Sequence, residues 1–354
     1  MGDGGHSIVG SYSKNDIIIR NTLRNNGDGV GLRPGRENPI VTLNDVSGTC
    51  FGTQRSDGAG IQLAQRAQSN ANVTNNWVHD SPKYGIRFDG EPPKIGVHGT
   101  VRSNVVFKLD AGGLQVKGDY HTADHNLAFD VSDGTTRAFP GCSLCVWKHC
   151  RANAGEMNAH STVTNNLADI GSGGRKFNFD TGKPLQPVQA WPLHGATVEN
   201  NLITPDIKML LHDPENRDFR VLAMYADVAG DKGPYQYKAD MKNYWIPGRI
   251  LYKASSPVPP THSATVIAAH RDALMWLNAA GCSTHHAYLS SEKDKVSTAD
   301  GAESESYVGS AEEGNNMVYL EESLETGVKY YWRVDAVRED GVVMRGDVWE
   351  FTTI

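Results

Sequence analysis

The 354-residue sequence has no long hydrophobic run and no excess of basic residues. No stretch approaches the ~18 consecutive apolar residues that a membrane-spanning helix needs, so we expect no membrane span. The net charge is −7, with acidic residues spread along the chain. This balance argues against a nucleic-acid partner, because proteins that bind nucleic acids present a basic surface to the phosphates.

Cysteine is scarce, with five residues in the chain: Cys50, Cys142, Cys145, Cys150 and Cys282. Three of them fall within residues 141–150, where a C-x-x-C pair is followed by His149 and a further cysteine. This spacing resembles that of zinc ligands, but the rest of a zinc site is not evident. The sequence is compatible with three states of these cysteines: a structural disulfide in a long loop, free thiols, or zinc ligation.

A hydrophobic leader is also missing. The first five residues are polar, and residues typical of a β-strand begin at Ile8 and Val9. We therefore expect that the native protein begins further upstream, so that the start of this sequence is no guide to localisation.

The most informative pattern is a small apolar residue, two spacers and an asparagine, which occurs seven times. The copies are Ile18–Asn21, Val41–Asn44, Val73–Asn76, Val101–Asn104, Ala123–Asn126, Val163–Asn166 and Val198–Asn201. The asparagines are 23, 32, 28, 22, 40 and 35 residues apart. A helical repeat does not vary in this way, whereas a stack of strand coils does, because each coil can carry an outer loop of any length.

After most of the asparagines we expect a polar loop and then a strand of the pattern Gly-apolar-x-apolar. The four copies are Gly29–Leu32, Gly60–Leu63, Gly85–Phe88 and Gly113–Val116. The alternation of period 2 predicts that Ile86 and Phe88 point into the stack and Arg87 points out. We expect the asparagines to form a buried stacking ladder at a tight turn, because asparagine tolerates left-handed backbone angles. An antiparallel sandwich would need hairpin turns that these long gaps do not provide.

The sequence after the repeats divides into two further regions. Residues 205–260 contain aromatics and prolines without periodicity, which suggests an irregular capping segment followed by a proline-rich linker at Ser255–Pro260. Residues 261–354 show the alternation of a small β-sandwich. The Leu324-x-x-Gly327-x-x-Tyr330 spacing resembles the tyrosine corner of fibronectin type III domains. The domains are therefore expected at 1–204, 205–260 and 261–354.

The coil pattern, including Gly85–Gly90 and Gly113–Gly118, resembles the right-handed parallel β-helix of the pectate-lyase-like superfamily. The resemblance covers about the first 200 residues. It implies an all-β fold, with a right-handed parallel β-helix of about seven coils followed by the β-sandwich. The segments Asp218–Arg220 and Tyr244–Arg249 resemble the tail of bacterial secreted proteins of this class. Its members are mostly polysaccharide lyases, glycoside hydrolases, epimerases and adhesins, so a secreted or cell-surface location is implied.

Stacking the glycine-led strands in register predicts two columns of outward side chains. The first contains Gly31, Gln62, Arg87, Gln115 and Cys145, and the second contains Arg33, Ala64, Asp89, Lys117 and Trp147. Neighbouring strands lie about 4.8 Å apart, so Asp89 and Lys117 should be neighbours. The simpler interpretation is structural: the two side chains form an ion pair between adjacent coils on a solvated face. Such a pair contributes ~0–1 kcal/mol to stability.

A lyase acting on an anionic sugar needs a base and a cation that stabilises the enolate. Lys117 or His121 are candidates for the base, and Arg87 for the stabilising cation. Asp89 and Asp119 are candidate ligands for calcium, a hard ion that prefers oxygen. This chemistry requires no cofactor. Calcium is the candidate metal ion for the two carboxylates.

Substrate contacts are expected from Gln115, Asp89, Arg33 and Trp147. A glycoside hydrolase would instead need two carboxylates about 5–9.5 Å apart, for which Asp89 with Asp119 or Asp110 is a possible pair. The sequence carries no exact catalytic motif of a lyase or hydrolase family.

Two functions follow. One is a secreted protein that cleaves a polysaccharide, with lyase chemistry favoured over hydrolysis. The other is a non-catalytic extracellular scaffold or adhesin, a β-helix rod with a β-sandwich spacer, which could assemble end to end or laterally.

Overall fold

The computed structural model describes residues 8–10, 12–25, 30–49, 58–89, 96–131, 142–146, 158–172, 196–261, 265–266, 268 and 271–354. The chain forms two compact units. The first comprises residues 1–207 and 229–234, and the second comprises 208–228 and 235–354. Within the described residues, no helix has the length and apolar character needed to cross a membrane.

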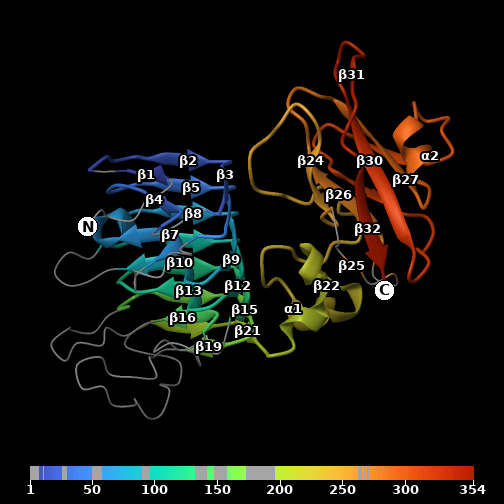
Figure 1. Cartoon of the computed structure of the whole chain (residues 1–354). Coiled ribbons are helices and arrows are strands. Elements are labelled where there is room, and N and C mark those ends of the chain that lie inside the picture. The colour runs from blue at the N-terminus through green and yellow to red at the C-terminus, as the bar shows by residue number, and fades with distance from the viewer. Residues whose placement is uncertain are drawn as a thin grey trace. The chain divides into compact units, whose positions relative to one another are not determined.

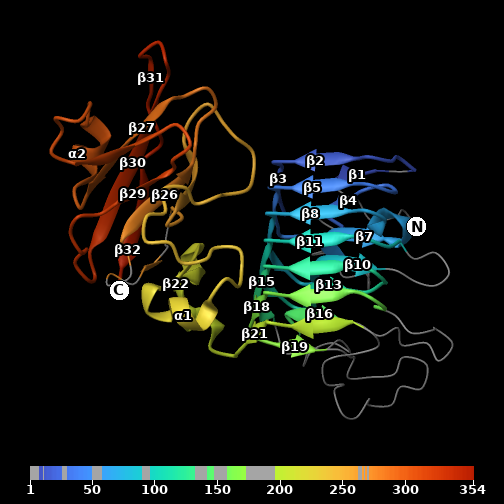
Figure 2. The same ribbon diagram turned by 180° about the vertical axis from the view of Figure 1, so that it is seen from behind.

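The first unit is a right-handed parallel β-helix, as predicted (Figure 1). Each of its seven described coils gives one strand to each of three parallel sheets, which we call A, B and C (Figure 2). Sheet A contains β1 (Ile8–Val9), β4 (Leu32–Arg33), β7 (Ala59–Ala64), β10 (Tyr84–Asp89), β13 (Gly112–Val116), β16 (Leu144–Val146) and β19 (Gly171–Ser172). Sheet B contains β2 (Ile17–Ile19), β5 (Ile40–Thr42), β8 (Asn72–Thr74), β11 (Thr100–Arg102), β14 (Thr122–Asp124), β17 (Thr162–Thr164) and β20 (Thr197–Glu199).

Sheet C is the part of each coil that the sequence analysis missed. It contains β3 (Thr22–Arg24), β6 (Asp45–Ser47), β9 (Trp77–Ser81), β12 (Val105–Leu109), β15 (Leu127–Val131), β18 (Leu167–Ala168) and β21 (Leu202–Ile203). The polar loop expected after the asparagines is therefore wrong, because a strand follows each asparagine directly. The apolar residues at its start, such as Trp77 and Val78, are the signal that could have revealed it.

The core of the β-helix is a set of stacked aliphatic side chains. The apolar residue of each repeat lies in sheet B, where Val73 pairs with Val41 on one side and Val101 on the other. In sheet A, Ile86 pairs with Ile61 and with Leu114 in the same way. These side chains are fully buried, so each coil is stabilised by the apolar surface of the coils above and below it.

The repeated asparagines form a hydrogen-bonded ladder at the corner between sheets B and C. Asn104 is typical: its Oδ1 accepts from the backbone N of Asn76 at 3.0 Å and from Asn76 Nδ2 at 2.9 Å. Its Nδ2 donates to the carbonyl oxygens of Val73 at 2.9 Å and Arg102 at 3.0 Å. The side-chain amide links continue from Asn21 to Asn201, which confirms the ladder.

The left-handed backbone at this corner belongs to a different residue than expected. The residue before each ladder asparagine has φ between 52° and 55°, in the series Arg20, Leu43, Asn75, Ser103, His125, Asn165 and Asn200. The ladder asparagine itself supplies the amide that spans two coils. Neither leucine nor arginine favours this conformation, so the tertiary hydrogen bonds impose it.

A second ladder, of glycines, determines the register of sheet A. A Cβ on Gly60 would lie 2.2 Å from Val78 Cγ1, and one on Gly31 would lie 2.6 Å from the Gly60 carbonyl oxygen. Gly85 and Gly113 are confined in the same way. Only a residue without a side chain fits where sheet A approaches sheet C.

The second unit contains antiparallel sheets that pack as a sandwich. One sheet has β24 (Ser255–Val258), β26 (Ala273–Leu277) and β29 (Met317–Tyr319). The other runs β25 (Thr265–Val266), β32 (Trp349–Thr353), β30 (Lys329–Val337), β27 (Thr284–Ser290) and β28 (Tyr307–Glu312), with β31 (Val343–Met344) beside β30. Both sheets contribute to one buried core, for example Trp276 from β26 and Trp332 from β30.

The remaining described elements are short. They are the hairpin of β22 (Leu211–Asp213) and β23 (Asp218–Val221), the helices α1 (Ala226–Ala229) and α2 (Lys293–Thr298), and the 3-10 turns η1 (Gln65–Gln68), η2 (Ile207–Leu210), η3 (Pro214–Asn216) and η4 (Ala223–Tyr225). The segment expected to be a linker instead contains β24, which pairs with β26. Its prolines permit this because β24 lies at an edge of its sheet.

The predicted tyrosine corner has the expected local contact. The hydroxyl of Tyr330 accepts a hydrogen bond from the backbone N of Glu325 at 3.0 Å. Membership of the fibronectin type III family stays a prediction.

We predict that Asn104→Ala destabilises the β-helix by about 2–4 kcal/mol, because it leaves the buried Asn76 N–H without its partner and removes the side-chain donor to the Val73 carbonyl. Urea unfolding measures this loss. Asn21→Ala is the matched control, because Asn21 is only half-buried, so water can replace its bonds. Equal losses for the two variants would contradict a burial-dependent ladder.

Candidate functional site

The outer face of sheet A aligns polar side chains from successive coils. Arg87 in β10 pairs in register with Gln62 in β7 and with Gln115 in β13, and Gln115 pairs with Cys145 in β16. Their neighbours in the chain, such as Ile86 and Leu114, point into the core. The alternation of each strand therefore creates the polar face that the sequence predicted.

Asp89 is the centre of this face. Its Oδ1 accepts from Lys117 Nζ at 3.0 Å, and its Oδ2 lies 3.1 Å from a terminal nitrogen of Arg87. Gln62 Nε2 is 3.5 Å from the same Oδ2. We call Arg87, Asp89 and Lys117 the Asp89 triad. The side chain of Asp89 is 19% exposed, whereas those of Arg87 and Lys117 are 4% and 5% exposed.

The electrostatics of the triad favour an ionised carboxylate. Burial raises the pKa of Asp89, but the charges of Arg87 and Lys117 and the hydrogen bonds from Lys117 and Gln62 together lower this pKa below its ordinary value. Two cations share one anion, so the triad carries one net positive charge.

Arg33 lies in a different column from the one predicted. Leu32 pairs with Ile61, which places Arg33 level with Gln62, in the column of Arg87 and Gln115. The prediction aligned Leu32 with Leu63, two residues further along. It was wrong because Gly31, and not Gly29, occupies the position of closest approach to the next coil.

His121 does not join the triad. Its Nδ1 accepts from the backbone N of Gly99 at 3.0 Å, and its Nε2 lies 2.8 Å from Gln68 Oε1. The ring is 1% exposed and contacts the edge of Phe88, with centroids 5.0 Å apart. Both ring nitrogens are engaged in these contacts and the ring is buried, so this geometry does not support His121 as the catalytic base, and that role stays a prediction.

The predicted calcium ligands are also committed elsewhere. Both oxygens of Asp89 contact cationic side chains, and Asp119 Oδ1 accepts from the backbone N of Ala159 at 3.0 Å in the next coil. Among the described residues, one group of three acidic or histidine side chains brings its ligand atoms within 4.8 Å, and it contains His212, Asp218 and Asp272. Calcium at Asp89 and Asp119 therefore gains no support from the geometry.

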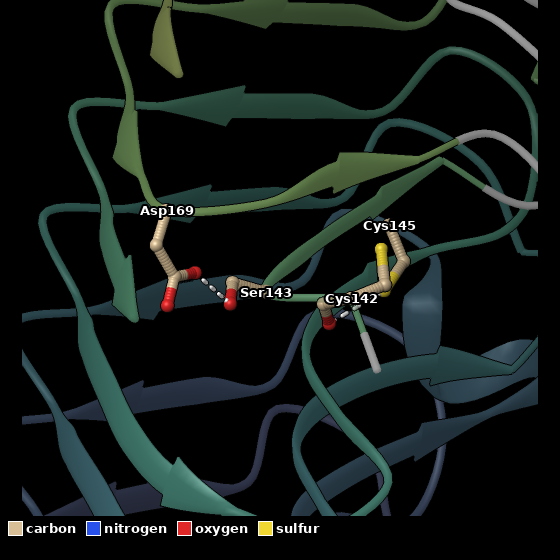
Figure 3. The surroundings of a disulfide bond; sticks show 4 residues. All are labelled: Cys142, Ser143, Cys145 and Asp169. Atoms are coloured by element: carbon tan, nitrogen blue, oxygen red, sulfur yellow. Dashed lines mark hydrogen bonds between the residues drawn. A yellow bond between two sulfur atoms is a disulfide. The ribbon is translucent and has the colours of Figure 1, made fainter. Parts of the chain in front are cut away.

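Cys142 and Cys145 form a disulfide that opens the sixth coil of the β-helix (Figure 3). Of the three alternatives for these two residues, the structure has the disulfide, which leaves no thiolate for zinc. Ser143, which lies between the two cysteines in the chain, donates a hydrogen bond from its hydroxyl to Asp169 Oδ1. Trp147, a predicted substrate contact, and Cys150 lie outside the described residues, and Cys282 is a free thiol.

Sequence reasoning missed the contribution of Tyr84. The guanidinium of Arg87 lies over its ring, 4.9 Å from the centroid, which adds a cation–π contact to the triad. An aromatic residue immediately before the glycine of a sheet A strand is the signal that could have identified it.

Comparison with known proteins supports the fold and adds no activity. A family model described as a right-handed β-helix region matches residues 1–129, which include the Asp89 triad. No curated protein matches the sequence. No solved structure matches it either.

We predict that His121 makes the stability of the β-helix pH-dependent. Burial, with a smaller effect of His98, lowers the pKa of His121 from 6.5 to about 3. Below pH 6.5 the unfolded chain therefore binds a proton at His121 that the folded chain does not bind. The contribution of His121 to the free energy of unfolding is complete above pH 6.5 and is lost as the pH falls from 6.5 to 3. The slope is at most about 1.4 kcal/mol per pH unit.

Urea titrations over this pH range measure the slope. His121→Gln removes the titrating group and should flatten the curve. His160→Gln, at an exposed turn residue, should leave the slope unchanged. The same slope in wild type and His121→Gln would contradict the assignment.

Proposed function

We propose that this chain is a secreted carbohydrate-active protein that binds an acidic polysaccharide along the outer face of sheet A and cleaves it by β-elimination. The observation that carries the proposal is the sharing of Asp89 by Arg87 and Lys117. The Arg87 guanidinium suits the carboxylate of a uronate sugar, which would bind beside Asp89 as a second anion. Because one fold can host many functions, this site supports the proposal and the β-helix alone does not.

The glutamines that flank the triad support a hydroxyl-rich ligand. Gln115 is 1% exposed, and its Oε1 accepts no hydrogen bond from the described residues. Buried polar atoms ordinarily have partners, and a sugar hydroxyl would supply the missing donor. Gln62, one coil to the other side of Arg87, offers a second amide.

The carboxylate count favours elimination over hydrolysis. In the outward columns of the described sheet A strands, Asp89 is the one carboxylate, whereas a glycoside hydrolase requires two. Elimination requires a base for the proton next to the uronate carboxyl and a cation for the enolate that forms. In this proposal the neutral amine of Lys117 takes the proton, Arg87 stabilises the enolate, and the glycosidic C–O bond breaks. A carbon–carbon double bond forms in the uronate, and the departing sugar oxygen takes a proton from water.

The alternative function is a non-catalytic extracellular scaffold. The low exposure of Arg87 and Lys117 supports this alternative, because the buried Lys117–Asp89 pair joins two adjacent coils. In that case, self-association through the stack ends or sides would be the activity, and sedimentation velocity would detect it.

The assay that tests the proposal follows product release from a panel of polyuronates and neutral glycans. Ultraviolet absorbance detects the unsaturated ends of elimination, and a reducing-end assay detects either reaction. We expect absorbance to increase with polyuronates. Parallel reactions with calcium and with a chelator test the predicted metal.

Three variants separate the site from the scaffold. Lys117→Ala should reduce the rate at least about 100-fold by removing the base, and Asp89→Asn should alter binding without removing it. Arg102→Ala is the control, because Arg102 pairs with Asp124 at 3.1 Å on sheet B and should have no effect. Full activity in Lys117→Ala would refute the site, and no activity with any polyuronate would favour the scaffold.

A further inference from the structure

The second unit contains a cavity of about 350 Å³ that the β-helix chemistry does not use. Its lining comes from the β22–β23 hairpin, the segment around 236–241, and the sandwich strand β29. This volume falls at the lower end of the range for small-molecule sites, ~300–1,000 Å³, which is enough for one or two sugar rings.

A buried ion network holds Arg220, which lines the cavity. Asp218, which is fully buried, accepts from Arg220 Nε at 2.9 Å and from a terminal nitrogen of Arg220 at 2.8 Å. Arg271 lies 3.4 Å from both Asp218 and Asp213. The two-point contact holds the Arg220 guanidinium in one orientation.

Arg220 in turn orients the acid that faces the cavity. The same terminal nitrogen donates to Asp272 Oδ1 at 2.6 Å, while the Asp272 side chain stays 46% exposed. His212 Nδ1 lies 3.8 Å from that oxygen. Burial raises the pKa of Asp218, but Arg220 and Arg271 lower this pKa to about 2, so Asp218 stays charged at ordinary pH. Asp272 is therefore an accessible carboxylate on a rigid support.

Two tyrosines give the cavity an aromatic side. Tyr237 and Tyr319 both line it, and each is 41% exposed. The hydroxyl of Tyr319 donates to the Met241 carbonyl oxygen at 2.9 Å, which holds that ring against the 236–241 segment. A rigid amphipathic ring offers large contact area at a low cost in conformational entropy.

The charge balance indicates which class of ligand fits. Among acidic and basic residues, the lining contains Arg220, Asp272 and the exposed Lys238, and the buried Asp218 that contacts Arg220 brings the sum of these charges to zero. A metal ion is disfavoured although His212, Asp218 and Asp272 have ligand atoms within 4.8 Å, because Arg220 already occupies oxygens of both acids. An anion is disfavoured because Arg220 already contacts two carboxylates.

From this geometry we propose that the cavity is a binding site for a neutral sugar residue. Asp272 accepts hydrogen bonds from adjacent hydroxyls, and the ring of Tyr237 contacts the apolar face of the sugar. The second unit then holds a glycan by itself, whether or not sheet A cleaves one.

Saturation-transfer difference NMR and isothermal titration calorimetry on the full chain test the proposal. The probes are the methyl glycosides of glucose, galactose, mannose and xylose, with their di- and trisaccharides. We expect at least one to bind. Asp272→Asn and Tyr237→Ala should each weaken that binding at least about tenfold, by removing a charged acceptor and a ring contact respectively.

Matched controls lie outside the cavity lining. Tyr252→Ala removes a ring that is 78% exposed, and Asp347→Asn removes an exposed acid that pairs with Lys253 at 2.8 Å. Both should bind the sugar as the wild type does. Lys117→Ala should also bind normally, which separates this site from sheet A.

Three outcomes would overturn the proposal. One is that no sugar of the panel binds at millimolar concentration. Another is that binding survives both Asp272→Asn and Tyr237→Ala. The third is that calcium chloride or sodium phosphate binds at Asp272 and the sugars do not, which would assign the network to an ion.

Discussion

The hydrogen bonds of the asparagine ladder determine where almost everything else in the β-helix lies. Each amide ties the corner of its own coil to the next, as Asn76 does to Asn104. The corner always has two residues, so the strands of sheets B and C enter and leave it in constant register. Because sheet A closes the same coils, this register brings the side chain of Asp89 between those of Arg87 and Lys117.

The parts of this arrangement that repeat could be predicted from the sequence. Seven asparagine copies indicate a coil stack, and the alternation of Ile86, Arg87 and Phe88 assigns one residue to the outer face. Period 2 and stacking are local rules, so they need no knowledge of the rest of the chain. The juxtaposition of Asp89 with Lys117 follows from those rules alone.

The parts that depend on three-dimensional packing could not be predicted. Two glycines precede Leu32, and only the contact of Gly31 with Gly60 decides which of them sets the register of Arg33. His121 carries a reactive side chain in a polar segment, but its burial beneath Gly99 appears only when coils are stacked. The ion network of the second unit joins residues more than fifty positions apart, such as Arg220 and Asp272. No pattern of residue spacing in the sequence could therefore reveal it.

The two-residue corner between sheets B and C separates each coil into a part of constant length and parts of variable length. Successive ladder asparagines are 22 to 40 residues apart, yet this corner never changes, so all the variation lies at the other two corners. Those corners adjoin both ends of the sheet A strands, where the Asp89 triad lies. Loops beside the polar face can therefore differ in length from coil to coil without a shift in register, so the surroundings of this face can vary while its strands stay aligned.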